Sequence, residues 1–227
     1  MHLRDVEHCL YGTVPIVAAT VPIAAGAALA AKLDGGDAIA VSFLGDGATE
    51  EGVFHETLNL SSSLRLPVLF LIENNFFASH LHIRLRQLFD SLCRFAEAHA
   101  VPWQRVDGND LVALNRACDS AIADARASGG PQLIEAVTYR WRGHVGHRED
   151  IDVGVARLEN LAHWKKRDPI ARLGTTLIAN GCLGEAELDR LWRDARGAVA
   201  DAWRQAMDDP YPSPGALLDR VHYKAAE

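Results

Sequence analysis

Two apolar segments joined by a helical pattern constrain this chain more than any other feature. Residues 38–44 form an apolar run broken only by Ser42, and residues 68–73 contain a second run. We interpret both as strands buried on both faces of a parallel sheet. Between them, residues 53–64 carry apolar side chains at roughly helical spacing, and Pro67 ends this segment. The order strand, helix, strand predicts a right-handed parallel crossover.

Polar residues follow both predicted strands. Asp46 stands between Gly45 and Gly47 after the first strand, and Asn75 follows the second. The carboxyl ends of neighbouring parallel strands meet at one sheet edge, so Asp46 and Asn75 can face each other. Their oxygens suit Mg²⁺ shared with phosphates, and the glycines would let the backbone turn sharply and approach a ligand. The N-terminus of the helix and the amides of Gly47 and Ala48 are expected to point at the same place and would favour an anion.

Each of these motifs alone is an ordinary turn sequence. Together, Gly-Asp-Gly and a later Asn-Asn resemble the thiamine-diphosphate motif. Residues 45–56 and the run Leu66-Pro67-Val68 are similar to the alpha subunit of the decarboxylating first component of 2-oxoacid dehydrogenase complexes. Pyruvate, branched-chain 2-oxoacid and acetoin dehydrogenases belong to this family. The resemblance covers essentially the whole chain from residue 1, and it implies a long N-terminal region that this sequence lacks.

The resemblance implies a fold and a set of ligands. The fold would be α/β, a parallel sheet sandwiched by helices, of the thiamine-diphosphate-binding type. Asp46 and Asn75 would be side-chain ligands of Mg²⁺, and the backbone carbonyl of Phe77 would be a third ligand. Gly47 and Ala48 would touch the cofactor's diphosphate, and Gly45 is a further expected cofactor-binding residue.

Two further positions are implied by the same resemblance. Relatives have Gly-Ile-Val where this chain has Pro15-Ile16-Val17, and backbone groups there hold the aminopyrimidine; Pro15 keeps its carbonyl but lacks an N–H. Val17 is therefore a candidate cofactor contact, although a buried helix with a hydrophobic lead-in explains this segment equally well. His144 ends a segment similar to the family's Tyr-Arg-x-x-Gly-His. It is the candidate catalytic histidine, to hydrogen-bond a diphosphate oxygen or to act as an acid or base.

The loops after the second strand and around His144 contain weaker candidates. His80 and His82 could contact substrate or could be solvated loop residues. His147 and Arg148 are candidates for substrate contacts. Val145 stands where mammalian pyruvate dehydrogenase has a regulatory serine, so phosphorylation is not expected at this position.

Periodicity and turn residues predict the remaining elements. We expect a helix entering near Pro22, a helix over 88–99 with Phe89 inward, and a helix over 111–127 after a short strand that begins near Val101. The further expected elements are a strand over 132–139 and helices from 168, including 185–207 with an apolar stripe. The run Val-Asp-Gly-Asn-Asp at 106–110 is interpreted as architecture. The whole chain is expected to be one domain, 1–227, with a helical extension over about 155–227.

Composition excludes several classes of protein. A net charge of −7 argues against a nucleic-acid partner. Four cysteines without Cys-x-x-Cys spacing indicate neither a zinc site nor a disulfide framework, which favours reduced thiols in the cytoplasm. The charged N-terminus argues against a signal peptide. The apolar segment 14–31 contains two prolines and is an unconvincing membrane span.

These observations and the resemblance favour one function. We expect an alpha-type subunit that uses thiamine diphosphate and Mg²⁺ to decarboxylate a 2-oxoacid and transfer the acyl group. The expected partners are a separate beta subunit, in a heterotetramer, and a lipoyl-bearing acyltransferase core. Two alternatives are a split transketolase-like or carboligating enzyme and a non-catalytic binding or scaffolding remnant.

Overall fold

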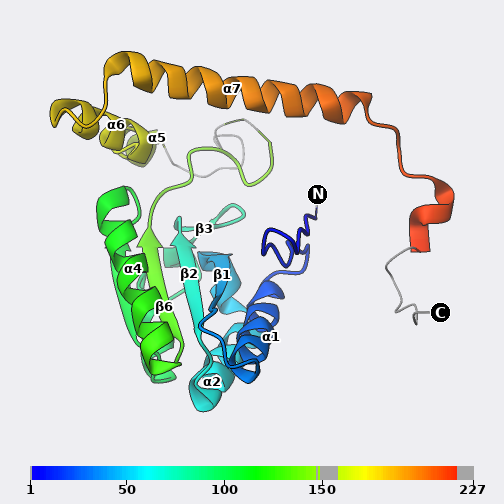
Figure 1. Cartoon of the computed structure of the whole chain (residues 1–227). Coiled ribbons are helices and arrows are strands. Elements are labelled where there is room, and N and C mark those ends of the chain that lie inside the picture. Colours follow the sequence, from blue (N-terminus) through cyan, green and yellow to red (C-terminus); the bar gives the residue numbers. More distant parts are fainter. Residues whose placement is uncertain (1, 147, 149–157, 219–227) are drawn as a thin grey trace. The chain divides into compact units, whose positions relative to one another are not determined.

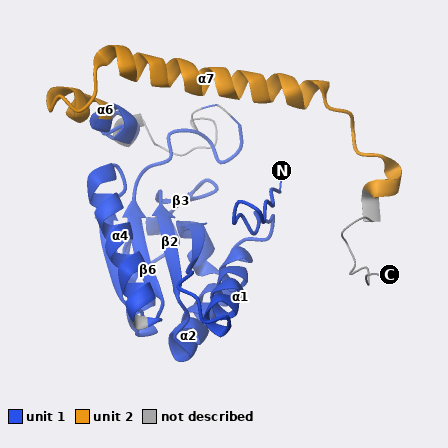
Figure 2. Cartoon of the chain, in the orientation of Figure 1, with its two compact units in different colours: residues 1–173 blue, residues 174–227 orange. Residues whose placement is uncertain are grey.

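The computed structural model describes residues 2–146, 148 and 158–218. The chain forms two compact units, residues 1–173 and 174–227, which Figure 2 distinguishes by colour. The expectation of a single domain with a helical extension stays a prediction.

A four-stranded parallel sheet forms the centre of the first unit. Its strands lie in the order β1 (Ala40–Gly45), β2 (Val68–Asn74), β6 (Gln132–Val137) and β5 (Trp103–Asp107). β1 and β2 are neighbours and parallel. They are joined by the 3₁₀ helix η1 (Asp46–Glu50) and by α2 (Gly52–Leu64). The predicted α/β class and parallel crossover connection are therefore confirmed.

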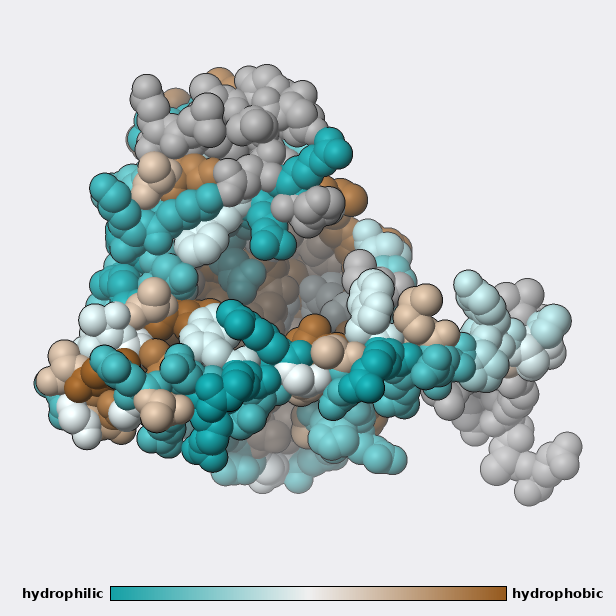
Figure 3. Space-filling model, turned by 90° about the horizontal axis from the view of Figure 1, so that it is seen from above, coloured by the Kyte–Doolittle hydropathy of each residue, from teal (hydrophilic) through white to brown (hydrophobic). Residues whose placement is uncertain are grey.

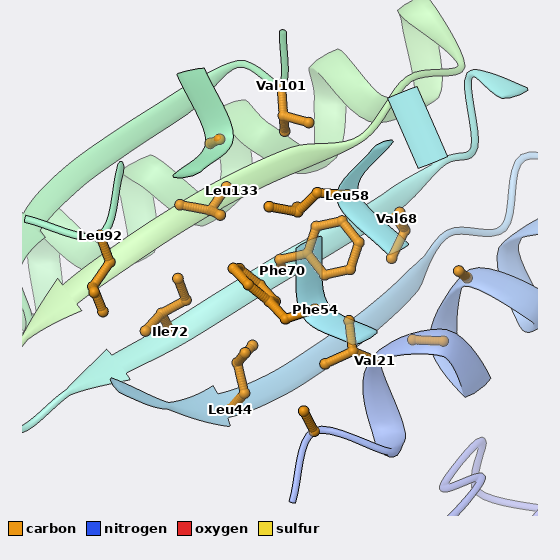
Figure 4. Close-up of a cluster of buried hydrophobic side chains, with 14 of the residues drawn as sticks. Val21, Leu44, Phe54, Leu58, Val68, Phe70, Ile72, Leu92, Val101 and Leu133 are labelled. Carbon is orange, nitrogen blue, oxygen red and sulfur yellow. The ribbon is translucent and has the colours of Figure 1, made fainter. Parts of the chain in front are cut away.

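Helices cover both faces of this sheet. The first face carries α1 (Thr20–Leu33), α2 and α3 (Cys93–Ala98), and α4 (Leu111–Ser128) lies on the other (Figure 1). Figure 4 shows how Phe54 and Leu58 of α2 pack against Phe70 of β2, with Leu44 of β1 and Leu133 of β6 beside them. This cluster fills the space between the helices and the sheet up to Leu44 and Ile72, near the carboxyl ends of β1 and β2. Close packing of this kind resists deformation, so it holds these strand ends in place.

The prediction that both strands of the crossover are buried on two faces is right for β2 and wrong for β1. In β2, residues 68–72 are all buried. In β1, Ser42 and Leu44 are buried, but Val41 is 40% exposed and Phe43 is 65% exposed. The reason is position, because β1 lies at one edge of the sheet and α4 packs on the other three strands, against Leu69 of β2, Ile134 of β6 and Val106 of β5.

The inward face of α2 is narrower than its apolar pattern predicts. Phe54, Thr57 and Leu58 are buried, as expected, whereas Leu60 and Leu64 are 50% and 43% exposed. Phe54 and Leu58 are four residues apart and share the face of the helix that meets the sheet. Leu60 comes two residues after Leu58, which places it on the opposite side of the helix, away from the sheet.

The predicted helix over 88–99 is also shorter in the structure. α3 begins only at Cys93, and Leu88 and Phe89 are 86% and 61% exposed before it. The side chain of Glu135 accepts hydrogen bonds from the backbone N–H of Leu92 and of the next residue. This acceptor satisfies N–H groups at the first turn and sets the point where the helix begins.

The other elements of the first unit agree with their predicted positions. Asp110 caps α4 by accepting a 3.0 Å hydrogen bond from the N–H of Ala113, and Gly129 ends it with φ +61°. After β2 comes a short hairpin of β3 (Phe77–Ala78) and β4 (Leu81–His82), followed by η2 (Ile83–Leu85). β3 lies just beyond the arrowheads of the central strands (Figure 1).

The C-terminal part of the chain is helical, as predicted. Its elements are α5 (Leu158–Lys165), α6 (Pro169–Ala179), α7 (Glu185–Asp208) and η3 (Pro214–Leu218). No residue of α7 is buried, and Val199 and Trp203 of its predicted apolar stripe are each 70% exposed. Seen from above, hydrophobic residues occur in small groups among hydrophilic ones (Figure 3). No helix among the described residues combines the length and the apolar character needed to cross a membrane.

Candidate metal and anion site

The strand register brings the polar motifs to one edge of the sheet. Gly45 of β1 pairs with Glu73 of β2, so Asp46 and Asn75 both lie just beyond the ends of their strands. The backbone of Asn75 is close enough to the Asp46 carboxyl group to lower its pKa. The structure therefore brings these two candidate ligands together.

Asp46 is completely buried, with an exposed fraction of 0%. Its Oδ2 accepts a hydrogen bond from Nη2 of Arg86, whereas Oδ1 has no hydrogen-bond partner among the described residues. Burial raises the pKa of Asp46, and the charge of Arg86 opposes this effect. A buried oxygen without a partner is costly, and a bound cation would satisfy it. The carboxylate therefore fits a metal ligand.

Arg86 holds the other side of this carboxylate. Its guanidinium donates through Nη2 to Asp46, through Nη1 to Glu50, and through Nε to the carbonyl of Leu81 at 3.1 Å. Glu50 also accepts a 2.7 Å hydrogen bond from Gln87. The guanidinium is thus fixed at Oδ2, which leaves Oδ1 available. Sequence reasoning did not single out Arg86, because nothing local marks it as the partner of a residue 40 positions away.

The backbone after Asn75 is sharply bent. The side-chain Oδ1 of Asn75 accepts from the N–H of Phe77 at 3.1 Å, and Oδ1 of Asn74 accepts from the N–H of Phe76 at 3.2 Å. Phe76 has φ +69°, a conformation that is rare for bulky side chains and that surrounding contacts must maintain. The Phe77 ring packs edge-to-face on Tyr139 at 5.6 Å, which holds the loop from the other side. An amide oxygen has two lone pairs, so Asn75 could also bind a cation.

A 3₁₀ helix follows the Gly-Asp-Gly turn. It precedes α2, which begins at Gly52, so the amides of Gly47 and Ala48 come before the N-terminus of the α-helix. The N–H groups of Gly47 and Ala48 lie in the first turn of this 3₁₀ helix, where helical N–H groups have no partner within the helix. They remain suitable for an anion.

Gly47 is required for space and not for an unusual backbone angle. A Cβ at Gly47 would lie 2.7 Å from the Cβ of Ala78 in β3. Gly45, by contrast, has φ −82°, and apart from its two chain neighbours no described residue has a heavy atom within 4 Å of a Cβ added there. Neither glycine has a backbone angle that other residues avoid, so the predicted sharp turn does not explain them. The other predicted reason, a close approach to a ligand, stays a prediction.

His144 lies on a loop that is tied to the hairpin after Asn75. The side chain of His144 is exposed, and its Nδ1 lies 3.4 Å from Nη1 of Arg140. Arg140 in turn donates to the backbone carbonyl of Ser79 in the β3–β4 turn. No described contact joins His144 to Asp46. The structure thus places the candidate histidine beside the loop that carries Asn75, but not on the carboxylate itself.

Val17 is 57% exposed, in the turn before α1. The next residue, Ala18, has φ +60° and is buried in the core. Among the described contacts, none connects Val17 to Asp46 or Asn75. The structure therefore does not bring this candidate to the other site residues.

The weaker candidates have mixed outcomes. His82 accepts a 3.1 Å hydrogen bond from the N–H of Arg84, and its ring packs 4.9 Å from that of Phe77, which are structural contacts. His80 is exposed. The carbonyl of Arg148 accepts from an N–H within its own loop, and His147 lies outside the described residues.

The Val-Asp-Gly-Asn-Asp run joins the ends of two strands to the turn that follows α5. Asp107 accepts a 2.6 Å hydrogen bond from Arg167, whose carbonyl accepts from Asn109 at 2.7 Å. Thr138, after β6, donates to Asn109 at 2.7 Å. Burial raises the pKa of Asp107, but the Asn109 N–H and Arg167 outweigh it and hold that pKa below its ordinary value. This network is architectural, as interpreted from the sequence.

Glu135 is a further buried carboxylate that sequence reasoning missed. It lies in the middle of β6, is 0% exposed, and accepts a 2.7 Å hydrogen bond from the side chain of Asn74. The signal was present, because a glutamate inside an otherwise apolar strand must find partners when it is buried.

The fold and the site define an α/β protein whose parallel strands end at a candidate site for a metal ion and an anion. Sequence comparison is more specific: residues 1–215 match the family described as "Dehydrogenase E1 component", and the chain belongs to this family. The resemblance found in the sequence motifs is thereby confirmed.

Three relatives show the extent of the similarity. The chain is 34% and 32% identical to the alpha subunits of acetoin:2,6-dichlorophenolindophenol oxidoreductase from Bacillus subtilis and Cupriavidus necator. It is 31% identical to the pyruvate dehydrogenase E1 component subunit alpha of Rhizobium meliloti. These matches cover 97–98% of this chain but only 66%, 66% and 63% of the relatives' own lengths.

Proposed function

We propose that this chain is the alpha-type subunit of a 2-oxoacid dehydrogenase that depends on thiamine diphosphate and Mg²⁺ and transfers an acyl group. The observation that carries this proposal is the buried Oδ1 of Asp46, which has no partner among the described residues and lies beside Asn75 at the carboxyl edge of the sheet. Membership of the E1 component family supports the cofactor.

The described residues fit such a cofactor. Oδ1 of Asp46, the amide oxygen of Asn75 and the carbonyl of Phe77 would hold Mg²⁺, because hard oxygen donors suit this ion. The N–H groups of Gly47 and Ala48 would hold the diphosphate, with Gly45 beside them and Val17 at the aminopyrimidine. When bound, thiamine diphosphate supplies the nucleophilic carbon and the electron sink for decarboxylation. His144, on its exposed loop, would hold or move a proton near the reacting group.

The proposed partners follow from the same relationship. The three relatives are named as alpha subunits, which supports a separate beta subunit and a heterotetramer. We also propose a 2-oxoacid as substrate, a lipoyl-bearing acyltransferase core as acyl acceptor, and a cytoplasmic location.

Binding of Mn²⁺ in the presence of thiamine diphosphate tests the metal site directly. The full chain, alone and mixed with its beta subunit, is titrated while free Mn²⁺ is measured by electron paramagnetic resonance. Asp46→Asn should abolish cofactor-dependent binding. Asp107→Asn replaces a carboxylate at the end of another strand, β5, of the same sheet. This variant should bind Mn²⁺ as tightly as the wild type does. Equal binding by wild type and Asp46→Asn, or no binding by wild type in either form, would overturn the proposal.

Activity provides the second measurement. The chain, its beta subunit, Mg²⁺ and thiamine diphosphate should reduce 2,6-dichlorophenolindophenol when a 2-oxoacid is added. A panel of 2-oxoacids then identifies the substrate. If no 2-oxoacid of the panel led to reduction of the dye, the result would count against the decarboxylating function. Cofactor binding would still be decided separately by the Mn²⁺ experiment.

A further inference from the structure

The carboxylate of Glu135 is completely buried and surrounded by hydrogen-bond donors. Oε1 accepts from Nδ2 of Asn74 at 2.7 Å and from Nε of Arg105 at 3.2 Å. Oε2 accepts from the backbone N–H of Leu92 at 2.9 Å and of Cys93 at 3.2 Å, at the start of α3. Both oxygens are therefore used, and each is used only as an acceptor.

This arrangement decides the orientation of the Asn74 side chain. An amide presents an NH₂ group on one side and an oxygen on the other. Because Glu135 accepts, the NH₂ group of Asn74 must face it, and a second hydrogen bond of 3.1 Å to the carbonyl of Asp90 holds the same group. The oxygen of Asn74 is left to accept from the N–H of Phe76 at 3.2 Å.

The Phe76 N–H belongs to the strained part of the loop. Phe76 has φ +69°, and the next N–H, that of Phe77, is held by Oδ1 of Asn75 at 3.1 Å. If the amide of Asn74 were reversed, its NH₂ group would meet the N–H of Phe76 and the bend would lose an acceptor. The backbone that carries Asn75 and the Phe77 carbonyl thus depends on the orientation of the preceding side chain.

We infer that Glu135 is a positioning residue of the cofactor loop: acting through Asn74, it fixes the backbone that presents Asn75 and the carbonyl of Phe77. The part of this inference that concerns the cofactor rests on the proposed function. The hydrogen-bond chain from Glu135 to the loop does not, so it can be tested without any cofactor.

Glu135→Gln tests the inference with almost no change in volume. A glutamine accepts at one end only. The two backbone N–H groups at the start of α3 cannot turn away, whereas the side chains of Asn74 and Arg105 can, so the NH₂ group of the glutamine should face Asn74. Amide hydrogen exchange at Phe76 and Phe77 should become faster by a factor of roughly 2 to 10, the range expected for loss of one hydrogen bond. Mn²⁺ affinity in the presence of thiamine diphosphate should fall roughly 10- to 100-fold, as for other residues that support metal ligands.

Asp107→Asn is the matched control. Asp107 is a hydrogen-bonded carboxylate on the neighbouring strand β5, and its partners Arg167 and Asn109 lie outside the loop. It should leave the exchange of Phe76 and Phe77 and the Mn²⁺ affinity unchanged. Urea unfolding measures the stability lost in each variant. If Glu135 contributed only to overall stability, the exchange rates of Phe76 and Phe77 would rise in both variants in proportion to that loss.

A double variant, Glu135→Gln with Asn74→Ala, tests whether the effect passes through Asn74. Asn74→Ala by itself removes the acceptor of the Phe76 N–H, so adding Glu135→Gln should not make the exchange of Phe76 faster still. A general loss of stability would add to the exchange rate in the double variant. Unchanged exchange in Glu135→Gln, or a further acceleration in the double variant, would overturn the inference. A wild-type chain that does not bind Mn²⁺ would overturn the proposed function, and the exchange rates would still decide the inference.

Discussion

The side chains of Asp46 and Arg86, 40 residues apart in the sequence, form an ion pair in which they are only 1% and 5% exposed. The pair joins the end of β1 to the segment after the β3–β4 hairpin. It uses one carboxylate oxygen and leaves the other at the strand ends. Arg86 therefore stabilises the buried charge of Asp46, and the second carboxylate oxygen of Asp46 stays available to a cation.

Arg86→Met should destabilise the protein by about 3–5 kcal/mol, because it leaves the buried Asp46 without its compensating charge. Urea unfolding at neutral pH measures this change. Arg126→Met removes an exposed arginine whose one hydrogen bond among the described residues is to the carbonyl of Asp37, and should stay within about 0.5 kcal/mol of wild type. A similar loss of unfolding free energy in the two variants would contradict the conclusion that Arg86 compensates the buried charge of Asp46.

Gly47→Ala should lower the free energy of unfolding by about 1–3 kcal/mol, because the new methyl group would overlap Ala78. The second change Ala78→Gly should restore most of the loss by removing the facing methyl group. Gly45→Ala, which adds a methyl group in open space among the described residues, serves as the control. Failure of Ala78→Gly to restore stability would show that the contact does not determine the need for glycine.

His55 should make stability depend on pH. Burial lowers the pKa of His55 from its ordinary value of 6.5, and His99 and Arg94 lower it further, against a hydrogen bond to Thr49 that raises it. Between the folded and unfolded pKa values the unfolded chain binds more protons, so stability rises with pH. The stabilisation is complete above 6.5 and is lost as the pH falls towards the folded value.

Urea unfolding of wild type and His55→Phe at about pH 5 and pH 7.5 measures this dependence. The variant should show a smaller difference between the two values. His2→Phe, at an exposed position, should keep the wild-type difference. If the stability of wild type and of His55→Phe depended on pH in the same way, His55 would not be the cause of the pH dependence.

Cys93 should be protected from alkylation in the native protein. Burial, together with the charge and hydrogen bonding of Glu135, raises its pKa to about 12, and the thiolate is the reactive form. Iodoacetamide at about pH 8 should label the exposed Cys9 and Cys182 quickly and Cys93 only after unfolding in urea. Mass spectrometry of peptides measures each site, and native labelling of Cys93 at the rate of Cys182 would contradict the buried environment.

Local patterns predicted the elements that carry the site. The apolar runs located β1 and β2, the helical spacing located α2, and the polar residues Asp46 and Asn75 marked the strand ends. These signals lie within a few residues of each other, and parallel pairing then places both ends at one edge. The roles of Val17 and His144 came from the family resemblance alone and stay predictions.

The sequence by itself therefore determined the α/β class, the crossover and the family of this protein. Only the tertiary structure decided that β1 is an edge strand with Phe43 exposed, that Arg86 pairs with Asp46, and that Glu135 supports the loop after β2. The physical reason is distance along the chain. Strand order and buried hydrogen bonds join residues tens of positions apart, and each of these residues looks ordinary among its own neighbours.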